Sequence, residues 1–193
     1  MRLLLAVGLL FCTCVSARAQ TLADYDYENL AFRGIGFDYG RIWPTRVAAT
    51  SVYGVRLDLG FLGPGVRVAP SLSYWSSHFR PAELDRLASQ INQLKALRDQ
   101  NVTITAANLG DIKWSDLSVG IDAHLLWTTP VGIYTYVGAG VSVHALNGQG
   151  AFIENTFIED LLDATAAGVA VMGGLEGQPL PRLRLYGEAR YTL

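Results

Sequence analysis

The chain has 193 residues, with 15 basic and 17 acidic side chains and a formal net charge of −2. This length accommodates one domain behind a leader, and a weakly acidic chain without a basic tract is a poor candidate for a nucleic-acid-binding protein. Both cysteines, Cys12 and Cys14, lie within the predicted leader, so the mature chain would have no thiol. A disulfide-stabilised secreted domain is therefore excluded. The chain has only two lysines, Lys95 and Lys113. Lysine commonly protects the exposed strands of soluble β-proteins against aggregation.

The amino terminus has the three parts of a secretion signal. Arg2 gives a positive start, residues 3–12 form an apolar run, and the sequence Ala-Arg-Ala at 17–19 fits the pattern of a cleavage site. The apolar run is shorter than the roughly 20 residues that a transmembrane helix needs. We therefore predict a signal peptide over 1–19 and a short periplasmic segment over 20–29.

Seven segments alternate apolar residues with polar or small ones, and this period of two predicts strands with one apolar and one polar face. In the second segment, Tyr53, Leu57 and Phe61 fall on the apolar face. Arg56 and Asp58 fall on the polar face of the same segment. Short turns follow the second, fourth and sixth segments, whereas long connections follow the third and fifth. The segments are 30–42, 49–61, 66–79, 113–127, 131–145, 164–175 and 182–193.

The long connection over 80–110 contains a predicted helix at 81–99. Proline is tolerated in the first turn of a helix, and apolar residues recur here at a spacing of three and four. The simpler interpretations are a helix that caps the mouth of a barrel or lies at a lipid interface. The alternative is a helix that binds a partner. The apolar stripe consists of Leu84, Leu87, Ile91 and Leu94.

The composition of the polar faces indicates which side of the sheet points inward. These faces are rich in Gly, Ser and Ala, which suits a narrow lumen better than a solvated exterior. Short turns that alternate with long connections are typical of outer-membrane barrels. We predict an all-β fold over 30–193, an antiparallel up-and-down transmembrane β-barrel of the eight-stranded type with one helix in an external loop. Closed single-chain barrels have an even number of strands, whereas seven are predicted here. We therefore expect that the barrel domain lacks its last strand.

With its leader, its strand pattern and tight turns such as Gly63-Pro64-Gly65, the chain resembles the small bacterial outer-membrane β-barrel proteins represented by the OmpA transmembrane domain and OmpX. The resemblance covers about 30–193. It implies localisation in the cell outer membrane and contact with outer-membrane lipid. We further expect a monomer that binds no nucleic acid and that can meet an extracellular partner through the loop 80–110.

Charged and imidazole side chains on the lumen faces form the predicted structural site, because buried charges are costly unless they pair with one another. We expect Asp58 to meet Arg67 through the tight turn, and Asp38 to meet Arg56 on the neighbouring strand. A barrel of this size is about filled by its own side chains, so a plugged lumen is favoured over an ion-selective pore. The predicted members are Asp38, Arg56, Asp58, Arg67, Asp116, Asp122, His124, His144, Arg184, Glu188 and Arg190.

The histidines and one serine are the candidates for chemistry. His124 and His144 are expected on neighbouring strands about 30 Å apart, too far to share a metal ion. His78 has no acidic neighbour in the sequence. Ser142 and His144, with Asp116, are the best approximation to a catalytic triad, and a hydrogen bond inside the lumen explains them at least as well. We therefore expect no catalytic residue, no metal and no cofactor.

The function that these patterns indicate is a non-catalytic outer-membrane barrel with a structural or surface-interaction role. Three alternatives stay open: a soluble periplasmic lipocalin-like barrel that binds an apolar ligand, a narrow pore, and a barrel enzyme that modifies lipids. The soluble alternative exchanges the two faces of every strand, so it requires an apolar interior and a polar exterior.

Overall fold

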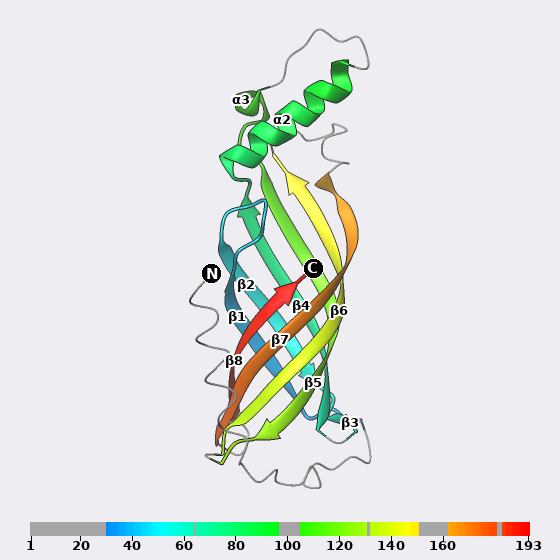
Figure 1. Cartoon of the computed structure of the whole chain (residues 1–193), viewed down its shortest axis with the longest axis vertical. Coiled ribbons are helices and arrows are strands. Elements are labelled where there is room, and N and C mark those ends of the chain that lie inside the picture. Colours follow the sequence, from blue (N-terminus) through cyan, green and yellow to red (C-terminus); the bar gives the residue numbers. More distant parts are fainter. Residues whose placement is uncertain (1–29, 64, 97–104, 131, 151–161, 181–182) are drawn as a thin grey trace, which may run out of the picture.

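The computed structural model describes residues 30–63, 65–96, 105–130, 132–150, 162–180 and 183–193. The predicted signal peptide and the segment 20–29 lie outside these residues. The strands curl into an elongated half-barrel that carries two helices at one end and a short strand, β3, at the other (Figure 1). We refer to these as the helix end and the β3 end.

The strands form one antiparallel sheet in which each long strand pairs with the next long strand along the chain. The order is β1-β2-β4-β5-β6-β7-β8, with β3 beside β4, and this confirms the predicted all-β up-and-down arrangement. Among the described strands, β1 and β8 each have one partner. The elements are β1 (Gly34–Ile42), β2 (Thr50–Asp58), β3 (Phe61–Gly63), β4 (Val66–His78), α2 (Pro81–Ala96), α3 (Ala106–Leu109), β5 (Lys113–Thr128), β6 (Tyr134–Gln149), β7 (Ala164–Leu180) and β8 (Leu183–Thr192).

Two strands continue beyond their predicted ends. β6 continues to Gln149, past the predicted end at residue 145. β7 continues to Leu180, past the predicted end at residue 175, and Leu180 pairs with Leu183 after a shift of register. The residues Gly177 to Pro179, which were expected to form a turn, therefore belong to the strand.

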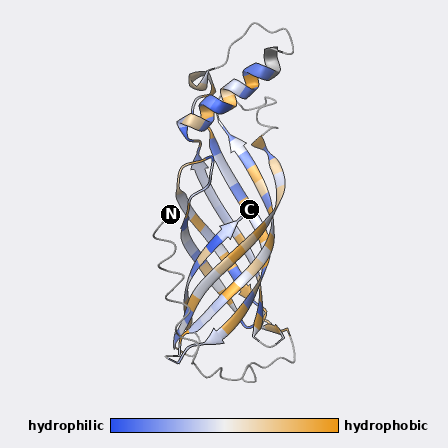
Figure 2. Cartoon of the chain, viewed as in Figure 1, coloured by the Kyte–Doolittle hydropathy of each residue, from blue (hydrophilic) through white to orange (hydrophobic). Residues whose placement is uncertain are grey.

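The two faces of the sheet differ in polarity, and the apolar face is the outer one (Figure 2). Along β1, Ile35, Phe37 and Tyr39 are exposed, Phe37 at 77%, while the residues between them are partly buried. The same alternation along β5 buries Asp122 and His124. Further outward apolar side chains are Tyr53, Leu72, Tyr74, Leu117, Val119, Ile121, Leu125, Val137, Val141, Val143, Val169, Val171, Leu175, Leu185 and Tyr191.

The connection between β2 and β3 interrupts this alternation. Gly60 has a φ of +78°, a backbone conformation that favours glycine. The hydrogen bonds to Val68 shift by one residue at this point, because Val68 accepts from Leu59 and donates to Gly60. The shift turns Phe61 inward, where it is buried beside Tyr136. The predicted outward position of Phe61 was therefore wrong, since one extra residue reverses the face of all that follow.

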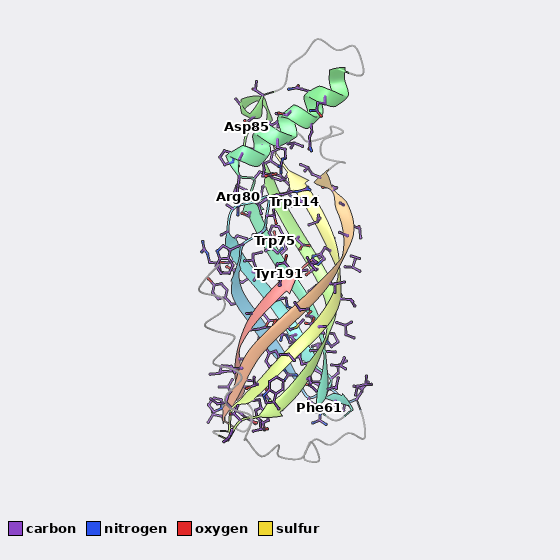
Figure 3. The ribbon with its side chains drawn as sticks, in the orientation of Figure 1. Phe61, Trp75, Arg80, Asp85, Trp114 and Tyr191 are labelled. Carbon is purple, nitrogen blue, oxygen red and sulfur yellow. The ribbon has the colours of Figure 1, made fainter. Side chains whose placement is uncertain are left out.

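Helix α2 caps the mouth of the half-barrel at the helix end. Leu84, Leu87 and Ile91 of its apolar stripe pack onto residues that precede β2, follow β4 and precede β5 and β7, whereas the side chain of Leu94 lies outside the described part. Trp75 and Trp114 are partly buried against this core. Figure 3 shows both tryptophans beneath α2. No helix in the described ranges is long and apolar enough to cross a membrane. The buried residues, which we call the mouth cluster, are Val47, Phe79, Leu87, Ala88, Ile91, Leu109, Ile112 and Leu162.

Candidate functional site in the lumen

Ion pairs fill the lumen toward the β3 end, and Arg56 on β2 is at their centre. Its Nη1 and Nη2 donate to Glu188 of β8 at 2.9 and 3.1 Å, and its Nη2 lies 3.6 Å from Asp38 of β1. Arg190 pairs with Glu188 at 3.1 Å and with Asp122 of β5. One guanidinium thus connects the two edge strands of the sheet across the lumen.

A second group of ion pairs lies nearer the β3 end. Arg67 on β4 donates to Glu176 of β7 at 2.6 Å, and Arg184 lies 3.5 Å from Glu176 and 2.9 Å from Asp58. Arg67 and Asp58 therefore have these partners in place of the contact expected between them. The curl of the sheet brings β7 opposite β4, so Arg67 reaches across the lumen. We call the two groups together the charge network: Asp38, Arg56, Asp58, Arg67, Asp122, Glu176, Arg184, Glu188 and Arg190.

Aromatic and imidazole rings join the two groups of ion pairs. The Tyr136 hydroxyl donates to Glu188 Oε2 at 2.9 Å, and the Tyr136 ring packs on the His124 ring with centroids 4.8 Å apart. The His124 Nδ1 atom lies 3.2 Å from Arg67 Nη2, so the imidazole contacts the second group as well. The charge network is therefore continuous from the middle of the lumen to the β3 end.

Glycines in the wall give these long side chains their room. A Cβ at Gly138 would stand 2.7 Å from the His124 ring, and a Cβ at Gly140 would overlap the Asp122 carboxylate. Both glycines lie on β6, directly opposite the residues that they accommodate. Because these positions of β6 carry no side chain, the side chains of His124 and Asp122 can extend over the backbone of β6.

Nearer the helix end, three side chains form a hydrogen-bonded chain. Ser142 Oγ lies 2.8 Å from His144 Nε2, and His144 Nδ1 lies 2.8 Å from Asp116 Oδ2. A carboxylate can only accept, so Nδ1 carries a proton, and in the neutral imidazole Nε2 then accepts from the serine hydroxyl. The side chains of His144 and Asp116 are 20% and 5% exposed. We call this arrangement the Ser142–His144–Asp116 chain.

Trp75 lies between this chain and the mouth cluster. The indole N–H of Trp75 donates to Asp116 Oδ2 at 3.0 Å, while the ring packs against the mouth cluster. A pair of hydroxyls, Ser73 and Ser118, lies 2.7 Å apart close by. Trp75 thus links the capped mouth to the polar lumen.

The two lumen histidines lie closer together than expected. His124 pairs with Gly138, six residues from His144 along β6, which corresponds to about 20 Å rather than 30 Å. The difference arises because the turn between Thr128 and Tyr134 is longer than predicted. The separation is still too large for one metal ion.

His78 lies at the surface, where its Nδ1 is 2.9 Å from Asp111 Oδ1. Within the described ranges, no group of three or more His, Cys, Asp or Glu side chains is arranged to hold a metal ion.

The sequence interpretation missed three residues of the lumen site. Glu176 was excluded because the predicted strand ended one residue earlier. Tyr136 and Tyr186 were not among the predicted members, although their hydroxyls bond to Glu188 and Asp38. Tracing the alternation one residue further along β7 would have found Glu176.

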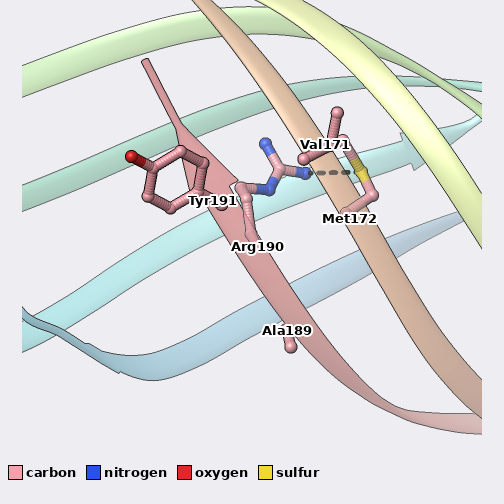
Figure 4. A pocket seen from close by; sticks show the side chains of 5 residues that line it. All are labelled: Val171, Met172, Ala189, Arg190 and Tyr191. Atoms are coloured by element: carbon pink, nitrogen blue, oxygen red, sulfur yellow. Dashed lines mark hydrogen bonds between the residues drawn. The ribbon is translucent and has the colours of Figure 1, made fainter. Parts of the chain in front are cut away.

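An open depression of about 350 Å³ lies at β7 and β8, lined by Val171, Met172, Ala189, Arg190 and Tyr191 (Figure 4). Its guanidinium, from Arg190, contacts Met172 Sδ at 3.4 Å and also belongs to the charge network. The guanidinium is therefore already engaged within the protein.

Comparisons of the chain with protein-family models, with curated proteins and with solved structures found no match.

Proposed function

We propose that the chain is an outer-membrane β-barrel protein with a structural or surface-interaction role and a lumen plugged by its own side chains. The observation that carries the proposal is the outer wall, where large apolar side chains such as Phe37, Val119 and Val141 are more than half exposed. A contiguous apolar surface of this extent is rare on a soluble monomer, and lipid would bury it at no cost in polar contacts.

The dimensions and the aromatic residues support the proposal. β1 and β2 each have nine residues, close to the 9–11 that a tilted strand needs to cross a bilayer. Trp43, Tyr39 and Tyr53 are exposed toward the helix end, and Phe32 and Trp127 toward the β3 end. Aromatic side chains at both ends of an apolar band are typical of the two membrane interfaces.

The interior supports a plugged barrel over its alternatives. The charge network contains four arginines and five carboxylates, so its charges nearly cancel, and each member has at least one ion-pair partner within it. A narrow pore requires an open path, whereas here the charge network and the mouth cluster occupy successive levels of the lumen. A soluble barrel for an apolar ligand requires an apolar interior, and this interior carries buried Arg67, Asp122 and Glu176.

In the proposed orientation, the helix end faces outside the cell and the short turns face the periplasm. The solvent side of α2 would then be available to an extracellular partner. Among the described side chains of α2, the exposed polar ones are Asp85, Arg86, Ser89, Gln90 and Gln93.

The test is a substitution at the middle of the outer wall. Val141 is 56% exposed and pairs with Ile121 and Val169. We expect Val141→Arg to cost about 2–4 kcal/mol at the bilayer midplane and to reduce the membrane-inserted fraction. The matched variant Val141→Leu should insert like the parent chain. The measurement is membrane fractionation, followed by gel migration with and without boiling.

A Val141→Arg chain that inserts as well as Val141→Leu would contradict the membrane proposal. A soluble parent chain with no shift on boiling would also contradict it.

A further inference from the structure

The Ser142–His144–Asp116 chain has the connectivity of a nucleophile, a base and an orienting acid. Both hydrogen bonds are 2.8 Å long, and a third bond from Trp75 to Asp116 holds the carboxylate in place. In this order, the imidazole can take the serine proton while the carboxylate stabilises the cation that forms.

The neighbouring wall leaves space for this chain. A Cβ at Gly168, directly across from Ser142 on β7, would stand 2.7 Å from His144 Nε2 and 2.9 Å from Ser142 Oγ. Any side chain at this position would displace the serine–imidazole bond. The absence of a side chain at Gly168 is thus a condition for the geometry observed.

A second glycine brings another hydroxyl close to Ser142. A Cβ at Gly120 would stand 3.0 Å from Val141 O, 3.2 Å from Ser142 Cβ and 3.4 Å from Ser71 Oγ, so the two serines pack closely on either side of this glycine. The Ser71 hydroxyl is the donor that this arrangement offers to the oxyanion of acyl transfer at Ser142.

We infer that Ser142 is the nucleophile of an esterase site for small carboxylic esters inside the lumen. Ser142 Oγ attacks the ester carbonyl carbon as its proton moves to His144 Nε2. The tetrahedral intermediate collapses, the C–O bond to the alcohol breaks, and the alcohol leaves with the proton from Nε2. Water then adds to the acyl-serine, again giving a proton to Nε2. Collapse of this second intermediate returns the proton to Ser142 and releases the carboxylic acid.

The surroundings define the class of substrate. Ser142 and His144 point into the lumen between the charge network and the mouth cluster, whereas a lipid ester would lie against the outer wall. The His144 side chain is 20% exposed, so a small ester dissolved in water reaches it although the lumen offers no continuous path. The lumen at this level is lined by Gly, Ser and Ala side chains beneath Trp75, which suits a short acyl group. The inference goes beyond the membrane role and does not depend on whether lipid covers the outer wall.

The experiment uses the full chain and a fluorophosphonate probe, with mass spectrometry to locate the modified residue. We expect the probe to modify Ser142, and His144→Gln to slow this modification about 10²–10⁴-fold. Ser118→Ala removes a nearby lumen hydroxyl that bonds to Ser73 and not to an imidazole, so it should leave the rate unchanged. Migration with and without boiling shows, for each variant, whether the fold is retained.

A second pair of variants separates a reactive site from a merely structural hydrogen bond. We expect the thiol of Ser142→Cys to react with iodoacetamide at least tenfold faster at pH 6 than the thiol of Ser118→Cys, because His144 stabilises the thiolate. His144→Gln combined with Ser142→Cys should remove this advantage. Failure of the probe to modify Ser142 in a folded chain, or equal reaction of the two thiols, would overturn the inference.

Discussion

The two halves of the lumen are filled in different ways by the same strands. Toward the β3 end, long arginine and carboxylate side chains reach across the lumen, and Arg56 and Arg190 each contact more than one acid. Toward the helix end, one serine, one imidazole and one carboxylate form a linear hydrogen-bonded chain beneath the mouth cluster. The half toward the β3 end is therefore stabilised by side chains that each make several contacts. The half toward the helix end depends on single hydrogen bonds, one after another.

The largest expected effect breaks the charge network at its centre. Arg56→Ala leaves Glu188 and Asp38 close together without their common cation, so we expect a loss of about 3–5 kcal/mol in the free energy of unfolding. The control is Arg184→Ala, whose side chain is 45% exposed, and which should cost about 0–1 kcal/mol. Urea unfolding followed by tryptophan fluorescence measures both. Equal losses for the two variants would show that Arg56 has no central role.

The second prediction separates the mouth cluster from the barrel wall. Ile91 of α2 is fully buried against the mouth cluster, and Ile91→Ala should cost about 2–5 kcal/mol of local stability. We expect faster amide hydrogen exchange in α2, with the change in gel migration on boiling preserved. Gln90→Ala, on the exposed side of the same helix, should change neither measurement. Loss of the folded band in Ile91→Ala would mean that the mouth and the wall unfold together.

The third prediction tests the glycine positions of β6 beside the charge network. Gly140→Ala introduces a Cβ where the Asp122 carboxylate lies, so we expect a loss of about 1–3 kcal/mol from overpacking. Gly187→Ala is the matched control, because a Cβ there meets no atom within 4 Å. Thermal unfolding in detergent compares the two variants. A Gly140→Ala chain as stable as Gly187→Ala would show that Asp122 can move without losing Arg190.

The smallest expected effect concerns the hydrogen bond between Trp75 and Asp116, which joins the mouth cluster to the Ser142–His144–Asp116 chain. Trp75→Phe keeps the packing against the mouth cluster but loses the donor to Asp116, which retains its bond to His144. We expect a loss of about 1.5 kcal/mol in the free energy of unfolding. Trp114→Phe removes a bond of 3.2 Å to the carbonyl of Leu162 and should cost about 1 kcal/mol or less. A larger loss from Trp114→Phe would contradict the importance of the charged acceptor.

The faces of the strands could be predicted from the sequence because apolar residues alternate strictly along segments such as β5. The inward position of Phe61 could not, since it depends on a single-residue shift at Gly60. Alternation carries no signal for such a shift except the glycine itself.

The candidate site could be predicted only where the partners are neighbours in the sheet. Arg56 and Asp38 lie on adjacent strands, and the structure brings them together. The bond between Arg67 and Glu176 joins β4 to β7, which are not neighbours, so it depends on how tightly the sheet curls. Curvature is a property of the whole sheet and cannot be read from any one strand.

The charge network also has a consequence for the order in which the chain folds. Each long strand pairs with the next long strand along the chain, so the ladders close loops that are short compared with the whole chain, the longest of them between His78 of β4 and Lys113 of β5, and they can form early. The Arg56–Glu188 and Arg67–Glu176 pairs instead join residues that are 132 and 109 positions apart. These ion pairs can form only after the intervening hairpins have assembled and the sheet has curled, so they mark the last step of folding rather than the first.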